Sequence, residues 1–168
     1  LSSDRLAPHV LHMVGDGPEL ERLQQIVRDA DGGDRVIFEG RKTQGEVADF
    51  MRRCDAFVFP SIRELGAGVV VEAMASGIVC IVADYGAPGD LVANGRGVQV
   101  PLGPIEDLVA GYRAAMEECL ERPGAHADMA RAARDHAFQA YTWDAKARYT
   151  ARLYDARLSD APLTGFTL

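Results

Sequence analysis

The sequence predicts an α/β domain of the Rossmann-like kind, a parallel sheet with helices on both faces. Three observations lead to this fold. Short apolar runs alternate with amphipathic stretches over the first two thirds of the chain, glycine-rich loops follow several of the runs, and the run at 56–60 is apolar throughout. A strand of that last kind is expected where both of its faces are covered. Repeated strand, loop and helix implies right-handed crossovers and therefore parallel pairing.

The first half of the chain predicts two strand–helix units. In each, a short apolar run leads into a segment whose apolar residues recur at helical spacing. Pro18 suits the first turn of the first helix, and Thr43 with Glu46 forms a capping box at the start of the second. The expected strands are 10–14 and 35–38, the second of them stopped by Gly40.

The second half predicts three more strands and a helical end. The strands are expected at 56–60, 78–83 and 97–101, and the helices at 69–76, 105–121, 125–140 and from 143 onward. Gly77 closes the first of these helices, Pro123 stops the second, and Thr142 caps the last. We expect Trp143, Ala147, Leu153 and Tyr154 to pack on the body. Residues 1–158 then form one domain, and 159–168 a flexible tail.

Length and composition exclude several classes of protein. The chain has 168 residues, with 48% hydrophobic and 26% charged residues, which fits one folded domain. A formal charge of −7 disfavours nonspecific binding to nucleic acid. The apolar runs are too short to cross a bilayer, and the first residues do not resemble a signal peptide. We expect a cytoplasmic piece of a longer chain, whose parent could also sit peripherally on a membrane.

The cysteines argue against a disulfide framework and against zinc. Cys54, Cys80 and Cys119 are odd in number, widely spaced and without a Cys-x-x-Cys pair. They are expected to be buried or half-buried hydrophobic residues in a reducing compartment.

Candidate ligand contacts come from the loops after the strands, since ligands of open parallel sheets bind at the carboxyl ends of the strands. The loop at 61–68 is the most informative. Gly66 and Gly68 allow close approach of the backbone, and the helix that follows presents free N–H groups suited to a diphosphate. Glu72 lies in an apolar stretch of that helix, where a ribose diol or an arginine would satisfy its carboxylate. Glu64, taken alone, is equally a solvated or capping acid.

The order of the motifs is more specific than either acid. Glu64 and Glu72 are separated by seven residues, after a strand ending in Pro60-Ser61 and within a segment that reads Glu-Ala-Met-Ala-x-Gly. Further motifs lie at 14–18, 35–40, 54–61 and 84–92. Together they resemble the C-terminal donor-binding domain of retaining GT-B glycosyltransferases of the large group 1 family, which use nucleotide sugars. The resemblance covers nearly the whole chain.

The resemblance implies roles for individual residues. Glu72 corresponds to the acid that holds the nucleotide ribose, and Glu64 to the acid near the donor hexose hydroxyls, which we take as catalytic. The other implied contacts are Gly66, Ala67 and Gly68 for the sugar and diphosphate, Val69 and Val70 for phosphate and ribose, Arg41 for the nucleobase, and Gly15, which keeps the first loop clear. The donor would be a UDP- or GDP-hexose, with no metal and no other cofactor. Leu65 and Ala67 replace family glycines, which shifts close backbone contact toward Gly66 and Gly68.

The family's domain opens with one more strand, together with cations for the diphosphate, and residues 1–8 cannot supply them. The acceptor domain is not in this sequence either, so we expect the chain alone to be catalytically silent. The strand would lie between those that end at Val14 and Pro60. We therefore expect either direct pairing of these two strands, or self-association through an exposed strand or the C-terminal helix.

Two other functions stay open at this point. Gly15-Asp16-Gly17 follows a strand, and Glu39 ends the next one, as in a nicotinamide-dinucleotide domain, although Leu20 occupies the place of the third glycine. The other is a nonenzymatic module that binds a nucleotide or assembles without turnover. His9 and His12 are expected to be packing or surface residues.

Overall fold

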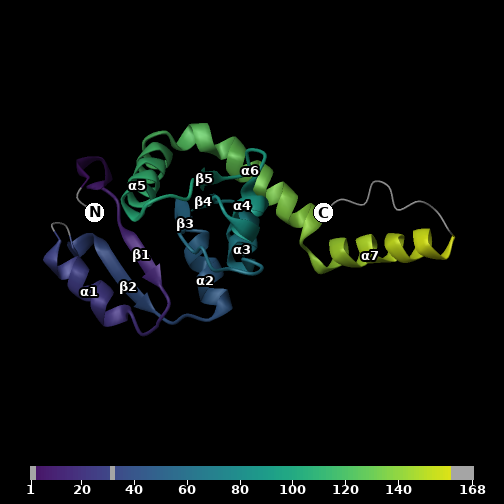
Figure 1. Cartoon of the computed structure of the whole chain (residues 1–168), viewed down its shortest axis with the longest axis horizontal. Helices are drawn as coiled ribbons and strands as arrows, with labels where there is room; N and C mark the ends of the chain where they lie inside the picture. Colours follow the sequence, from purple (N-terminus) through teal and green to yellow (C-terminus); the bar gives the residue numbers. More distant parts are fainter. Residues whose placement is uncertain (1–2, 31–32, 160–168) are drawn as a thin grey trace.

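The computed structural model describes residues 3–30 and 33–159, and its elements alternate between strand and helix until residue 100 (Figure 1). The strands are β1 (Leu11–Val14), β2 (Val36–Gly40), β3 (Ala56–Phe59), β4 (Val79–Ala83) and β5 (Val98–Val100). The helices are α1 (Leu20–Asp29), α2 (Gln44–Met51), α3 (Gly68–Ser76), α4 (Gly86–Val92), α5 (Ile105–Glu121), α6 (Pro123–Ala140) and α7 (Trp143–Leu158). Short 3₁₀ turns, η1 (Asp4–Leu6) and η2 (Gly33–Arg35), precede β1 and β2.

The strands form two separate parallel sheets. β1 pairs with β2, and β3, β4 and β5 pair in that order. Of the two expected alternatives, direct pairing of β1 with β3 was wrong, and self-association stays a prediction. The position of β1 is held elsewhere, because η1 is tied to α5 and the His12 ring lies 5.7 Å from the Phe50 ring of α2. Each of the two strands therefore keeps one edge without a strand partner within the described residues.

The tie between η1 and α5 consists of charged side chains. Arg5 Nη1 lies 2.8 Å from Glu117 Oε2, and Arg5 also pairs with Glu121. These contacts join residues more than a hundred positions apart in the sequence. They attach the segment before β1 to the body that surrounds the larger sheet.

The core lies on both faces of the larger sheet, which confirms the predicted α/β layering. Side chains of β4 alternate between two clusters: Cys80 and Val82 face one, and Val79 and Ile81 face the other. All five residues of β4 are buried. Helices α3 and α4 pack in the first cluster and α5 in the second, so that the central strand is covered on both sides.

Several predicted helix ends are confirmed. The Thr43 side chain accepts from the Glu46 N–H, and the Glu46 side chain accepts from Thr43, which is the expected capping box. Gly77 ends α3 in the left-handed conformation, with φ 77°, and Thr142 caps α7 through the Ala145 N–H.

All three cysteines are free, with Cys80 and Cys119 buried and Cys54 half-buried.

The C-terminal helices depart from expectation in two ways. Helix α5 ends at Glu121, as expected near Pro123, but α6 begins at Pro123 rather than at residue 125, because proline is well tolerated in the first turn of a helix. Helix α7 extends away from the body (Figure 1), so Trp143 is 90% exposed and Tyr154 66% exposed, and the expectation that they pack on the body was wrong.

The tail expected at 159–168 lies outside the described residues from position 160 onward. None of the helices in the described ranges is both long and apolar enough to cross a membrane.

Candidate functional site

The carboxyl ends of β1 and β2 form an open, glycine-lined corner. Gly15 follows β1 with φ 139°, and its N–H donates to the Gly40 carbonyl at 2.9 Å, which joins the two strand ends. A Cβ at Gly15 would meet nothing within 4 Å. Glycine is therefore required at this position by its backbone conformation rather than by crowding.

The loop between β3 and α3 is folded around the Glu64 carboxylate. Glu64 Oε1 accepts from the N–H groups of Leu65, Gly66 and Ala67 at 3.0, 3.4 and 3.2 Å. Successive backbone N–H groups that converge on one oxygen make an anion-binding concavity. In this structure the loop's own acid fills it, so Glu64 and the amides of Gly66 and Ala67 meet one another.

At the start of α3, some residues are buried and hydrogen-bonded within the turn, whereas others lie closer to the surface. Ala67, where the family usually has glycine, takes the left-handed conformation with φ 46° and ψ 42° and is 1% exposed. Its carbonyl accepts from the Val70 N–H at 2.8 Å and from the Val71 N–H at 3.4 Å. Val70 is fully buried, whereas Gly68 is exposed and Val69 is half-buried. Gly68 and Val69 are thus the positions of this turn that lie closer to the surface.

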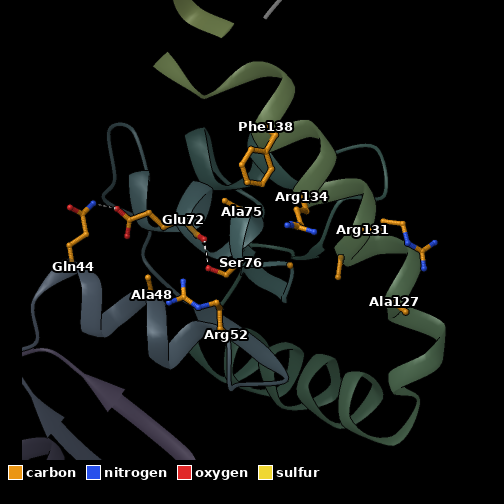
Figure 2. A pocket seen from close by; sticks show the side chains of 12 residues that line it. Gln44, Ala48, Arg52, Glu72, Ala75, Ser76, Ala127, Arg131, Arg134 and Phe138 are labelled. Atoms are coloured by element: carbon orange, nitrogen blue, oxygen red, sulfur yellow. Dashed lines mark hydrogen bonds between the residues drawn. The ribbon is translucent and has the colours of Figure 1, made fainter. Parts of the chain in front are cut away.

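Glu72 is half-buried on α3, one turn further along, and it has a partner that the sequence analysis missed. Gln44 Nε2, at the first position of α2, donates to Glu72 Oε1 at 2.7 Å (Figure 2). The capping box predicted that a helix begins here. It could not predict the contact with Glu72, because the two residues are 28 positions apart in the sequence. Only the packing of α2 beside α3 brings them together.

Glu72 and Gln44 lie at one end of a cavity of about 780 Å³ between α2, α3 and α6. Figure 2 shows their side chains pointing toward each other, with Arg52 and Arg134 further along. The complete lining is Gln44, Ala48, Arg52, Glu72, Ala75, Ser76, Gly77, Ala127, Ala130, Arg131, Arg134 and Phe138. Of the predicted site residues, Glu72 alone lines this cavity. Gly15, Glu64 and Gly66 lie in the loops that follow β1 and β3, and Gly68 is the first residue of α3.

Glu39, the acid of the nicotinamide alternative, is already paired within the protein. Its Oε1 lies 2.9 Å from His12 Nδ1 and its Oε2 lies 3.6 Å from Lys42 Nζ. The hydrogen bond from His12, followed by the charges of Lys42 and His12, holds the pKa of Glu39 below its ordinary value. Arg41, next to Lys42, is exposed on the loop between β2 and α2.

The thiols do not have the character of nucleophiles. Burial raises the pKa of Cys80 to about 12 and that of Cys119 to about 11, and it also raises that of Cys54. A reactive cysteine needs the opposite shift. Among the described residues, no three His, Cys, Asp or Glu side chains are grouped in a way that could hold a metal ion.

Comparison with known sequences identifies relatives of one kind. Residues 2–136 match the family described as glycosyl transferases group 1. Glycogen synthase of Mycobacterium tuberculosis H37Rv is 34% identical over 86% of this chain and 34% of that protein. D-inositol 3-phosphate glycosyltransferase of Streptomyces avermitilis is 31% identical over 94% of this chain and 33% of that protein. The chain therefore spans about a third of the curated relatives that it matches.

Solved structures with the same fold include one of a nucleotide complex. Anabaena HepE in complex with UDP superposes with a TM-score of 0.73 and 25% identity, over 91% of this chain and 43% of that one. Sucrose-phosphate synthase of Thermosynechococcus elongatus superposes with a TM-score of 0.74 over 94% of this chain and 41% of that one. At 24% identity, the second likeness concerns the fold alone.

Proposed function

This chain belongs to the group 1 glycosyl transferases, and from that premise we propose that it is the donor-binding half of a larger enzyme. The enzyme would transfer a hexose from a nucleotide-diphosphate sugar to an acceptor, with retention of the anomeric configuration. The observation that carries the proposal is the Glu72 carboxylate, half-buried at one end of the cavity and held by a neutral amide. The complex of the similar HepE with UDP supports a nucleotide as the ligand.

In the proposed complex, each site residue acts on one part of the donor. Glu72 accepts hydrogen bonds from the ribose, Glu64 lies near the hexose hydroxyls, and Arg41 borders the nucleobase. Gly66, Ala67, Gly68 and Val69 contribute backbone toward sugar, diphosphate and ribose, while Gly15 leaves room for them. Val70 lies near the phosphate and ribose, but its N–H already donates to the Ala67 carbonyl. The Glu64 carboxylate now occupies the amides of Gly66 and Ala67, so it would have to turn toward the hexose before these amides could face the donor.

The chemistry needs no resident cofactor or metal under this proposal. The leaving diphosphate would be stabilised by oriented N–H groups and cations, which act strongly in a site from which water is excluded. The acceptor would bind to a part of the protein outside this sequence. Since proximity of donor and acceptor contributes several kcal/mol to such a transfer, the chain alone would bind nucleotide without turnover. We expect a cytoplasmic location, which fractionation of the producing cells would test.

Glu72→Ala is the direct test of the binding proposal. The variant should weaken nucleotide binding by about 1–3 kcal/mol while the fold survives, because it removes a charge-assisted hydrogen bond. Isothermal titration with UDP, GDP and NAD separates the proposed function from the dinucleotide alternative. A chain that binds only NAD, or whose nucleotide affinity is unaffected by the substitution, would count against us. For the full-length enzyme, NMR of the product anomer tests retention.

We also propose that the chain on its own self-associates. β1 and β3 each have a free edge, and β1 also exposes the apolar side chains of Leu11 and Val14, which are 38% and 39% exposed. Unpaired strand edges favour pairing with another chain. Helix α7 adds Trp143 and Leu158, which are 90% and 86% exposed. Light scattering over a concentration series should show an apparent mass that rises with concentration, and a constant monomer mass would overturn this proposal.

A further inference from the structure

The contact between Gln44 and Glu72 joins two helices at one end of the cavity. Gln44 Nε2 donates to Glu72 Oε1 at 2.7 Å, and the residues are 28 positions apart (Figure 2). A carboxylate has about four lone-pair positions, and this bond uses one of them. Oε1 keeps a second position and Oε2 keeps both, so the carboxylate can accept from two neighbouring hydroxyls without losing Gln44.

Both ends of the contact are held by ordered backbone. On α2, the Thr43 N–H donates to Glu46 Oε2 at 2.8 Å and the Glu46 N–H donates to Thr43 Oγ1 at 3.4 Å, which fixes the turn from which Gln44 projects. On α3, the neighbours of Glu72 in the core are Ala73 and Met74, both fully buried. The amide and the carboxylate therefore meet from two fixed helix positions.

The chemical type of the partner matters as much as its place. An arginine in contact with Glu72 would neutralise the carboxylate and compete for both of its oxygens. An amide donates one hydrogen bond and leaves the negative charge in place. The hydroxyls of a ligand then still meet an ionised acceptor, which makes the stronger kind of hydrogen bond.

We infer that Gln44 is a positioning residue for recognition of the ribose diol: it orients the Glu72 carboxylate so that the free lone pairs face a nucleotide with both hydroxyls present. The inference rests on the proposed function, in which Glu72 binds the ribose. Gln44 also directly follows the loop assigned to the nucleobase, which contains Arg41. The loop and the ribose acid are thereby linked through one side chain.

The experiment compares a ribonucleotide with its 2′,3′-dideoxy analogue. Isothermal titration is run on the whole chain with UDP or GDP, whichever binds more tightly, and with the analogue that lacks the diol. Gln44→Leu removes the donor at similar size, and Gln44→Glu replaces it with a second carboxylate. The control is Gln25→Leu, because Gln25 makes the same kind of bond, to Asp29 Oδ1 at 2.8 Å, on the exposed surface of α1.

Gln44→Leu should weaken binding of the ribonucleotide about two- to tenfold, the loss expected for one hydrogen bond, and leave the dideoxy analogue unchanged. Gln44→Glu should weaken the ribonucleotide at least as much, and Gln25→Leu should change neither ligand. Equal losses for both ligands would indicate a merely structural contact and overturn the inference. Unchanged affinity for the ribonucleotide would overturn it as well.

Failure of the proposed function gives a different pattern. If the wild-type chain binds neither nucleotide, or binds ribonucleotide and dideoxy analogue equally, Glu72 has no ribose to hold, and the inference falls together with the proposed function. If Glu72→Ala abolishes the preference for the diol and Gln44→Leu preserves it, the inference about Gln44 alone is wrong. Thermal unfolding of each variant establishes that the fold is retained.

Discussion

The two sheets of this molecule are built from similar sequences and are buried to very different degrees. In β4 of the larger sheet all five residues are buried, whereas in β1 the outer two residues are exposed and the inner two half-buried. Ile81 of β4 is fully buried, and Ile37 of β2 is 41% exposed. Helix α1, which follows β1, has no buried residue, while α3 contributes three. Apolar sequence thus predicts a strand, but the neighbours of the strand decide how much that strand contributes to stability.

The cause is the number of layers around each sheet. β4 has a strand on each side and helices on both faces, so every side chain meets packed neighbours. β1 and β2 pair only with each other, and β1 retains an open edge toward β3. A two-stranded sheet is marginal by itself and depends on what packs against it.

The largest difference is expected from a matched pair of isoleucines. Ile81→Ala should lower the free energy of unfolding by about 2–5 kcal/mol, since it removes fully buried methylene groups and leaves a cavity. Ile37→Ala should cost only about 1 kcal/mol, because the side chain is already partly in water. Urea unfolding followed by circular dichroism measures both. Equal losses would mean that the small sheet is as well packed as the large one.

The second largest difference in stability between the two regions is expected from alanine substitutions at a matched pair of glycines. A Cβ at Gly97 would lie 2.7 Å from the Cys80 carbonyl oxygen and 2.7 Å from Val92 Cβ, so Gly97→Ala forces the core beside β5 to shift. The expected loss is about 1–3 kcal/mol. A Cβ at Gly17, after β1, would meet nothing within 4 Å, and Gly17→Ala should stay within about 0.5 kcal/mol. Thermal unfolding is sufficient here, and a large loss at Gly17 would show packing that we have not recognised.

The pH dependence of the smaller sheet follows from Glu39. The His12 bond holds its pKa below the ordinary 4.5, so the folded state binds this proton less readily than the unfolded state. The pair therefore stabilises the β1–β2 region above about pH 4.5, and this contribution disappears as the pH falls through the lowered pKa. Glu39→Gln should flatten the fall in stability below pH 4.5, as measured by urea midpoints. Adding His12→Ala should then have little further effect on that slope.

The smallest effect is expected at the tie between η1 and α5. Arg5→Ala removes two ion pairs, to Glu117 and Glu121, in which the Arg5 side chain is half exposed to solvent, and such pairs contribute little to global stability. It should nevertheless speed amide hydrogen exchange in β1, because this contact attaches the preceding segment. The matched control is Arg22→Ala, whose pair with Glu19 lies within the α1 region. Similar exchange in both variants would mean that β1 is held by other contacts.

How much the sequence could predict depended on whether the signal was local. Periodicity gave the bounds of α5, and the capping box at Thr43 gave the start of α2, because both involve residues within a few positions of each other. Pro123 correctly predicted the end of α5, but the start of α6 was placed two residues late, because a proline that stops one helix can also occupy the first turn of the next. Trp143 misled because an apolar residue at helical spacing does not say whether another surface is there to cover it.

The candidate site divides in the same way. The spacing of the motifs predicted Glu72 as a site residue, and in the structure Glu72 lines the cavity. Gln44 could not be found, since the contact depends on the packing of two helices. The sequence also could not predict that the Glu64 carboxylate accepts hydrogen bonds from the amides of its own loop. A flexible acidic side chain at this position can equally face solvent or a ligand.

The tie between Arg5 and α5 has a consequence for the order of events during synthesis. Arg5 leaves the ribosome before Glu117, which is made 112 positions later. At translation rates of about 5–20 residues per second, the two side chains cannot meet until on the order of ten seconds have passed. The small sheet can form by local pairing in that interval, but it has to wait for α5 before it can dock. Nascent chains stopped before residue 117 would then present β1 and β2 as the part most open to proteases.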